Sequence, residues 1–436
     1  MKNLFLLACM AMLILCGCGQ TYETRTLHLL SFGNEEQRGE LLRSGIDLFN
    51  EMHPNVQYEL SEDRYVENNQ DHLRYIKYFE ETYDKEVVDI FLVGHIFMPY
   101  LVNHGYIVDV DSVMTKDIFS QELFPRLWES IRYNNKYYGV IDDVEAQCIF
   151  LNRSVLRAMG YSDAEIESIP LAVQRGELLL EDVIEIARFG EENDLTEYGL
   201  LHRPTIGKAY YMLSELYGGI SHSSEEGISI HEDGIRRMLD FFYTNAIETG
   251  ITPRNNAEMT WAEIHDIVAR GQTAVFLGAV YTPFDLQAET TYSADSMDQY
   301  IPILYPALEE GQQPTTISMP MVFTITANSA YAEDIREILY LSSVQFEDKA
   351  KYSAENYHFP IFTSSLDAKA FKTQSFLQDT LYMLDYTTFM PNNEQTIYVL
   401  QDIYDTICLV ESGQADIDEA LEYLQMARAK AEDDLS

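Results

Sequence analysis

The stretch that decides the fold runs from Glu129 to Leu156 and reads ESIRYNNKYYGVIDDVEAQCIFLNRSVL. Within it, residues 133–140 (YNNKYYGV) place turn-forming residues between aromatic flanks, which is typical of a β-hairpin. Residues 148–151 (CIFL) form an apolar run that predicts a buried strand, and a helix is expected to begin at Ser154. A hairpin, a strand and a helix in direct succession indicate a protein that mixes strands and helices.

The chain on both sides of this stretch alternates in the same way. Apolar runs predict strands at residues 26–32, 56–60, 87–93, 273–277, 300–304 and 321–326. Helical spacing predicts helices at residues 35–52, 66–84, 97–103, 180–193, 209–217, 235–248 and 261–270. From Glu333 onward we expect nearly all helix. Such alternation indicates an α/β protein with right-handed crossovers, and 436 residues exceed what one hydrophobic core usually organises.

The composition excludes several classes of partner. Apolar residues make up 46% and charged residues 23%, as in ordinary globular proteins. With 29 basic and 71 acidic side chains the net charge is −42, so the chain repels phosphate backbones and we expect no nucleic-acid partner. Anionic small ligands are disfavoured by this global field, although a local pocket could override it. The chain is rich in Tyr, which offers both a stacking face and a hydroxyl.

The first residues carry the features of an export signal. Lys2 precedes an apolar run from Leu4 to Leu15, which is too short to span a bilayer as a helix and suits a signal peptide. The run ends in LCGC at residues 15–18, which resembles a bacterial lipobox. That resemblance implies removal of residues 1–17, lipidation of Cys18 on sulfur, and a tether over residues 18–25. An ordinary secretory signal cut nearby is the alternative.

Two further cysteines, Cys148 and Cys408, remain in the exported chain. Both sit in apolar-periodic surroundings, so buried free thiols are the simpler expectation, with one disulfide between them as the alternative.

Signatures of catalysis and of metal binding are missing. The sequence contains no G-x-S-x-G elbow, no H-E-x-x-H pair and no Walker A loop. The ten His residues are scattered without metal-ligand spacing, so we expect no metal and no cofactor. Neighbouring acids such as Asp142 and Asp143 could serve glycoside hydrolysis, but a chain this acidic produces such neighbours by chance.

Three collinear blocks resemble the maltose-binding type of ABC solute-binding proteins, the family 1 extracellular solute-binding lipoproteins. The opening stretch matches the family's Y-N-G-K … V-E-A … Y-N-K-D-L-L pattern at seven positions, which are Tyr133, Asn134, Lys136, Val144, Glu145, Ala146 and Asn152. Residues 271–281 resemble its G-x-T-A-M … G-x-W block. Residues 390–421 resemble its M-P-N … S-G … D-E-A-L ending.

The resemblance implies a two-lobed type II periplasmic-binding-protein fold with a cleft between the lobes and a helical C-terminal region. Lobe one is expected to hold residues 26–142 and 305–330, and lobe two residues 143–304 and 331–436. Such proteins close on a carbohydrate by hinge motion and deliver it to the transmembrane subunits of an ABC importer, without catalysis. We therefore expect a monomer on the extracytoplasmic face of the cell membrane, which it contacts only through its lipid.

Several residues are candidates for ligand contact, because a sugar offers apolar faces to aromatic rings and hydroxyls to carboxylates and amides. By resemblance, Glu145 corresponds to an acidic cleft residue, Tyr281 to a stacking Trp, and Tyr210 and Tyr211 to cleft aromatics. Position in the expected fold adds further candidates, which follow predicted strands, flank the segment that crosses between the lobes near Glu145, or begin a helix. They are Asn34, His95, Asp142, Asp143 and Trp261. Packing, helix capping or hinge bonding is the alternative for each.

The sequence departs from the maltodextrin binders at two places. Ile96-Phe97 stands where they carry Asp-Arg, and Leu400 stands at the position of their C-terminal stacking Trp. We therefore expect a mono- or oligosaccharide other than maltodextrin. Two alternatives stay open, which are an extracytoplasmic glycan-cleaving enzyme with a carboxylate pair, and the same fold binding a cationic peptide or polyamine.

Overall fold

The computed structural model describes residues 23–32, 38–65, 72–83, 85, 87–122, 124, 127–223 and 227–435. The predicted signal peptide, Cys18 and Asn34 lie outside the described residues. The predicted tether was drawn too long, since Glu23–Arg25 already belong to the first strand and pair with Val56–Tyr58. Across the described residues, none of the helices combines the length and apolar character that crossing a membrane requires.

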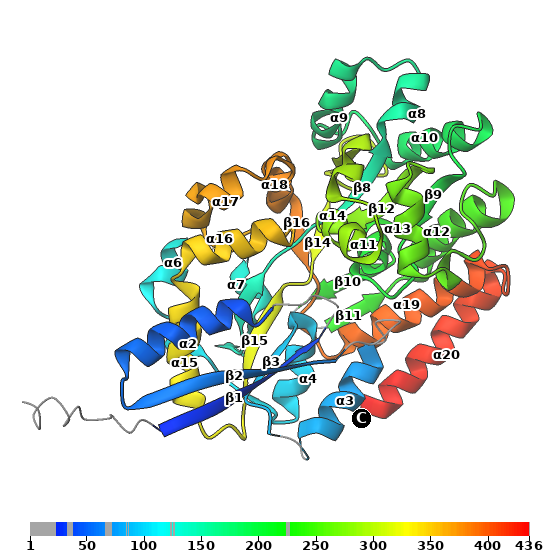
Figure 1. Ribbon diagram of the computed structural model, residues 1–436. Coiled ribbons are helices and arrows are strands. Elements are labelled where there is room, and N and C mark those ends of the chain that lie inside the picture. The colour runs from blue at the N-terminus through cyan, green and yellow to red at the C-terminus, as the bar shows by residue number, and fades with distance from the viewer. Residues whose placement is uncertain are drawn as a thin grey trace, which may run out of the picture.

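The first sheet occupies one half of the molecule (Figure 1). Its strand order is β2-β1-β3-β15-β4, and β7 also pairs with β15. Strands β1, β2 and β3 are parallel, whereas β15 runs antiparallel to β3. The strands are β1 (Glu23–Phe32), β2 (Val56–Tyr65), β3 (Ile90–Gly94), β4 (Ile107–Val108), β7 (Val140–Asp143) and β15 (Met321–Thr326). The chain returns to this sheet at the antiparallel strand β15, after passing through the other half of the molecule.

Short helices and a hairpin surround the first sheet. The hairpin predicted at residues 133–140 is confirmed as β5 (Arg132–Tyr133) and β6 (Lys136–Tyr137). Its two turn residues, Asn134 and Asn135, both have positive φ, as a two-residue type I′ turn requires. The helices are α2 (Glu40–Met52), α3 (His72–Tyr83), η1 (His95–Phe97), α4 (Met98–Asn103), α5 (Asp111–Met114), α6 (Asp117–Glu122) and α7 (Leu127–Ser130).

The second sheet has the order β13-β8-β12-β9. Its strands are β8 (Gln147–Asn152), β9 (Tyr198–His202), β12 (Thr273–Ala279) and β13 (Tyr300–Ile303), and all but a few of their residues are buried. A small hairpin of β10 (Ile220–Ser223) and β11 (Gly227–Ile230) lies apart from it. The helices of this half are α8 (Arg153–Ala158), α9 (Asp163–Gln174), α10 (Leu180–Glu192), α11 (Lys208–Leu216), α12 (Glu232–Tyr243), η2 (Thr244–Glu248), η3 (Asn256–Glu258), α13 (Trp261–Ala269), α14 (Thr282–Glu289) and η4 (Ala294–Gln299).

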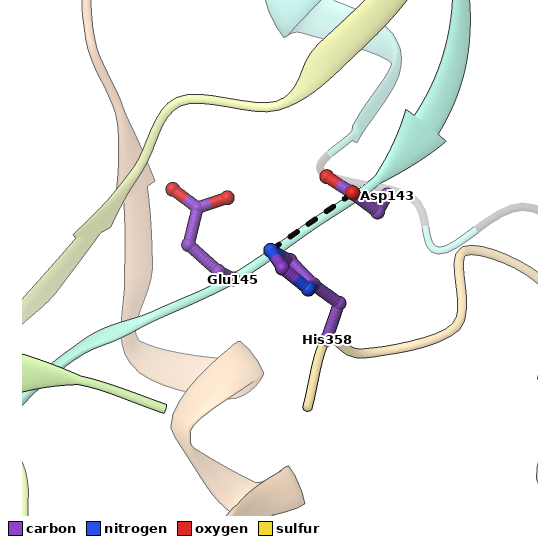
Figure 2. Close-up of side chains that lie close together, drawn as sticks. All are labelled: Asp143, Glu145 and His358. Carbon is purple, nitrogen blue, oxygen red and sulfur yellow. Dashed lines mark ion pairs between the residues drawn. The ribbon is translucent and has the colours of Figure 1, made fainter. Parts of the chain in front are cut away.

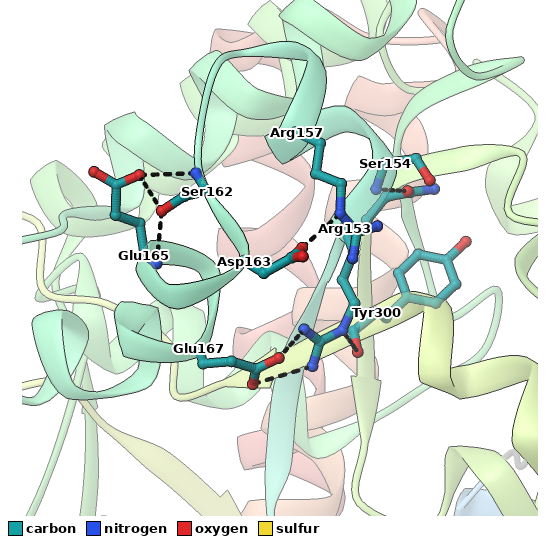
Figure 3. Close-up of polar contacts among 9 residues, drawn as sticks. Arg153, Ser154, Arg157, Ser162, Asp163, Glu165, Glu167 and Tyr300 are labelled. Carbon is teal, nitrogen blue, oxygen red and sulfur yellow. Dashed lines mark hydrogen bonds and ion pairs between the residues drawn. The ribbon is translucent and has the colours of Figure 1, made fainter.

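Polar side chains fix the far corner of the second half, where β8 turns into α8 (Figure 3). The Asn152 side chain caps α8 by accepting from the Ser154 N–H at 2.9 Å. Arg153 donates to the Tyr300 carbonyl at 3.2 Å and forms an ion pair with Glu167 of α9. Strand β8, strand β13 and helix α9 are thereby held in one arrangement.

The chain passes between the halves along three segments. Residues 144–146 join β7 to β8, and β14 (Thr316–Ser318) leads back into β15. Strand β16 (Thr387–Phe389) pairs in parallel with β14 and precedes α19 (Gln395–Glu411). An isolated bridge between Val144 and Phe359 adds to this junction. Two sheets joined by crossing strands confirm the expected two-lobed α/β fold.

The C-terminal helices divide between the lobes, which corrects the expectation that residues 331–436 belong to lobe two. Helices α15 (Ala332–Ser343) and α16 (Phe346–Glu355) pack on α2 of the first lobe, because their apolar faces meet its buried stripe. Helices α19 and α20 (Ile417–Leu435) pack on α12 of the second lobe. Between these pairs lie η5 (Thr363–Asp367), α17 (Lys369–Lys372), α18 (Ser375–Thr380) and η6 (Leu381–Tyr386).

The two cysteines of the described chain are free thiols. Cys148 is buried in β8 and Cys408 is half-buried in α19. Burial raises the pKa of the Cys408 thiol to about 12, so it stays protonated at neutral pH. The simpler of the two expectations, free thiols without a disulfide, is confirmed.

Candidate functional site

A cavity of about 130 Å³ lies between the two lobes. The first lobe contributes Phe32, Arg38, His72, Tyr75, Gly94 and Phe97 to its wall. The second lobe contributes Arg203, Lys208, Trp261, Tyr281, Asp285 and Glu289. The junction contributes Glu145, Met319, Met321 and His358. A ligand in this cavity would touch both lobes and the segments that join them.

Glu145 lies on the first crossing segment and is 2% exposed. One carboxylate oxygen accepts from the Met319 N–H at 3.0 Å, on the segment that returns to the first lobe. The same oxygen forms an ion pair with Lys208, the first residue of α11. Burial is the largest influence and alone would lower the pKa of Lys208, but the charge and hydrogen bond of Glu145 together with Tyr281 hold the pKa above its usual value. Glu145 therefore connects two crossing segments with the second lobe.

The side chains of Asp143, Glu145 and His358 lie close together (Figure 2), and each offers one potential metal-ligand atom within 4.8 Å of the other two. Two cations already neutralise this cluster, because Arg38 lies 2.9 Å from Asp143 and Lys208 pairs with Glu145. A divalent ion placed there would face both side-chain cations at close range in a medium of low polarity. The arrangement is therefore that of a buried ion-pair network rather than of a metal centre.

Asp142 and Asp143 end β7 with their side chains fully buried. The Arg38 guanidinium lies 3.5 Å from the Asp142 carboxylate and 2.9 Å from that of Asp143. Burial alone would raise the pKa of Asp143, but the charges of His358, Arg38 and Lys208 hold it below the usual range. Neither carboxylate lines the cavity. Arg38, which pairs with both, lines the cavity in their place, and ligand contact by Asp142 and Asp143 stays a prediction.

Aromatic and cationic groups stack along the wall of the second lobe. The Tyr281 ring lies parallel to the His358 ring, with centroids 5.3 Å apart. On the same wall, the Arg203 guanidinium carbon lies 4.1 Å from the centroid of Trp261, and one of its N–H groups donates to the Tyr281 hydroxyl. The predicted residues Tyr281 and Trp261 both line the cavity as aromatic surfaces, although Trp261 is covered in part by Arg203.

Three other predicted residues are buried away from the cavity. The His95 ring forms a hydrogen bond with the Met390 carbonyl at 2.9 Å, and burial lowers its pKa to about 4. Tyr210 donates to the Arg203 carbonyl and contacts the His202 ring, while Tyr211 is 0% exposed. All three belong to the packing of the lobes and do not line the cavity, so the structure gives their predicted ligand contact no support.

Sequence reasoning missed most of the charged wall. Arg203 follows strand β9, which the sequence did not predict because Gly199 interrupts a run of only five residues. A cation directly after a buried strand was the available signal, and Lys208 at the start of α11 was a second. Arg38, His72 and His358 come from segments that only the tertiary fold brings together.

The fold is that of sugar-binding ABC solute-binding proteins. T. maritima MalE3 with bound maltose superposes with a TM-score of 0.72 at 14% identity, over 93% of this chain and 99% of that one. A solute-binding protein from Thermotoga lettingae bound with α-D-tagatose gives 0.72 at 15% identity, over 92% and 98%. One from Listeria monocytogenes in complex with cycloalternan gives 0.70 at 15% identity, over 94% and 99%. No protein-family model and no curated protein matches the sequence.

Proposed function

We propose that the protein is a solute receptor that captures a carbohydrate between its lobes and delivers it to an ABC importer. The single observation that carries this proposal is the cavity itself, which is lined by both lobes and by two of the three crossing segments, on a fold shared with sugar-binding proteins. Binding in such a place couples ligand contact to the relative position of the lobes.

The wall chemistry supports a saccharide. Tyr281, Trp261, Tyr75 and Phe97 offer aromatic surfaces to the apolar faces of a sugar ring. Carboxylates such as Glu145 can accept hydrogen bonds from the hydroxyls of a sugar. When the lobes close and exclude water, any polar group left without a hydrogen bond costs binding free energy, which disfavours a ligand that does not match the site. This combination fixes both the position and the orientation of a polyol.

The size of the cavity bears on how the ligand enters. About 130 Å³ is less than the roughly 300–1,000 Å³ typical of small-molecule pockets. We infer that the lobes separate to admit a saccharide and close on it. The three crossing segments are where such a hinge would act.

The alternatives draw less support. A glycan-cleaving mechanism through Asp142 and Asp143 would need two accessible carboxylates, and both are buried against Arg38. A cationic ligand would meet Arg203 and Lys208 on the wall. The solved structures that the chain resembles are binding proteins, so we propose binding without turnover.

A thermal-unfolding screen against mono- and oligosaccharides tests the proposed function. A ligand present at a hundredfold excess over its Kd stabilises the folded protein by about 2.7 kcal/mol, which raises the unfolding midpoint measurably. We expect at least one saccharide to do so. If a broad panel of neutral and acidic saccharides leaves the midpoint unchanged, the proposed function is wrong.

Tyr281→Ala is expected to weaken saccharide binding at least about tenfold, because it removes an aromatic surface of the cavity. Tyr281→Phe keeps the ring and should retain most of the affinity. Tyr161→Ala, at a site 37% exposed on the second lobe, is a matched control. Calorimetric titration of the three variants makes the comparison, and equal affinity in Tyr281→Ala and wild type would remove Tyr281 from the site.

We further propose a lipid anchor at Cys18 that holds the receptor at the extracytoplasmic face of the cell membrane. This rests on the lipobox at residues 15–18. Cys18→Ala should abolish incorporation of radiolabelled palmitate and release the protein from the membrane fraction. Continued labelling of the variant would contradict the anchor.

A further inference from the structure

Buried cations gather at the cavity of a very acidic protein. The chain has only 29 Lys and Arg against 71 Asp and Glu. Nevertheless Arg38 is 5% exposed and Arg203 is 9% exposed at the cavity wall, and the Lys208 side chain is 10% exposed there. Burying a charge is costly unless a partner compensates it, so each of these cations needs an explanation.

Arg38 and Lys208 have carboxylate partners, but Arg203 does not. Among the described residues, no carboxylate lies within ion-pair distance of the Arg203 guanidinium. One N–H group donates to the neutral Tyr281 hydroxyl, and Nε is buried without a hydrogen-bond partner. The Trp261 face, 4.1 Å from the guanidinium carbon, and the charge of Asp285, which acts without an ion pair, compensate the Arg203 charge in part. The wall thus holds a buried cation with donors left over.

Lys208 adds a second positive charge near the Tyr281 ring, close enough to Arg203 for the two charges to interact. The Lys208 nitrogen and the Arg203 guanidinium carbon are each 5.4 Å from the centroid of the Tyr281 ring. Their mutual repulsion acts to lower the pKa of Lys208, against the stronger opposing effect of Glu145. Lys208 has three N–H donors, and among the described residues its only ion pair is with Glu145. An anion between the two cations would relieve the repulsion.

We propose that the ligand is an acidic saccharide, a uronic acid or an oligosaccharide with a uronic acid residue, whose carboxylate binds between Arg203 and Lys208. The sugar ring would then lie against Tyr281. A guanidinium fork binds a carboxylate through two parallel hydrogen bonds, which neutral hydroxyls cannot match. The wall carboxylates Glu145 and Glu289 already pair with Lys208 and His265, and their remaining acceptor capacity would serve the hydroxyls of the sugar. This inference rests on the proposed function and narrows its ligand class.

Calorimetric titration at fixed ionic strength tests the inference with D-galacturonate and D-glucuronate, their short oligomers, the matched neutral sugars D-galactose and D-glucose with theirs, and acetate as an anion without a sugar. We expect an acidic saccharide to bind at least about tenfold more tightly than its neutral counterpart. Arg203→Gln should weaken that binding about 10- to 100-fold. Arg236→Gln, at an exposed pair with Asp418, should leave it unchanged.

The outcomes separate the two proposals. Neutral sugars that bind as tightly as uronates, with Arg203→Gln unaffected, would overturn the acidic ligand and leave the saccharide receptor standing. Acetate binding as tightly as the uronates would overturn the acidic saccharide as ligand, and no binding by any saccharide would contradict both proposals. If Arg203→Gln does not fold, wild-type protein still decides, because uronate affinity should fall as NaCl is raised whereas neutral-sugar affinity should not.

Discussion

Replacing Arg38 by Met is expected to cost the folded protein about 3–5 kcal/mol at pH 7. The substitution keeps the volume of the side chain but leaves Asp142 and Asp143 buried without the guanidinium that lies 3.5 and 2.9 Å from them. The buried Lys349 also interacts with both carboxylates, but its pKa is lowered by burial, so it is a weaker source of charge. Urea unfolding followed by circular dichroism measures the loss.

The loss of folding stability caused by Arg38→Met should become smaller as the pH falls. Although burial raises the pKa of Asp143, its cationic neighbours lower it further than burial raises it. A carboxylate with a depressed pKa contributes stability above its unfolded value of about 3.9, and the contribution is lost as the pH falls through the folded pKa. Wild type and Arg38→Met should therefore converge in acid. Arg236→Met, which removes two exposed ion pairs, with Glu232 and Asp418, should cost less than about 1 kcal/mol. A similarly small loss in Arg38→Met would contradict the network.

Glu145→Gln is expected to destabilise the protein by about 3 kcal/mol, because it leaves the Lys208 charge buried without its partner. Gln keeps an oxygen that can accept from the Met319 N–H, so the change isolates the charge. Lys208→Met should cost a similar amount by leaving Glu145 unpaired.

The double variant tests whether the two residues act as a pair. Glu145→Gln/Lys208→Met removes both charges, so its loss should fall short of the sum of the single losses by about 1–3 kcal/mol. Chemical unfolding of the four proteins completes the cycle. Strictly additive losses would show that the ion pair does not connect the crossing segment with the second lobe.

Local patterns were sufficient to predict the elements on which the fold depends. The strands at 148–151, 273–277 and 321–326 were recognised because each is a buried apolar run, and they became β8, β12 and β15. Short strands such as β9 and β16 were not predicted, since segments of five and three residues that contain Gly or Thr show no clear apolar periodicity. The sequence also did not predict which lobe α15 and α16 pack on, because both lobes offer apolar surfaces and only tertiary contacts select one.

Site residues could be predicted where their position along the chain, relative to the predicted strands and crossing segments, places them at the cleft. Glu145 lies on the crossing, and Tyr281 follows a central strand, so their positions lead to the cleft. Tyr210 and Tyr211 illustrate the limit, because adjacent helical residues point in different directions and here both are taken up by the core. The sequence could not rank Arg203 and Lys208 above other cations, since their significance comes from their burial and from the absence of an ion pair at Arg203 among the described residues.

The most direct test of the account is the electron density of a co-crystal with a saccharide that raises the unfolding midpoint. We expect an intact ligand in the cavity between the lobes, in contact with Tyr281 on one side and with the Phe97 wall on the other. A second groove, lined by Glu80, Asn103, Tyr133 and Tyr398, offers about 630 Å³ outside this cleft. Density for the ligand in that groove alone, or for a cleaved sugar in the cleft, would contradict the central claim.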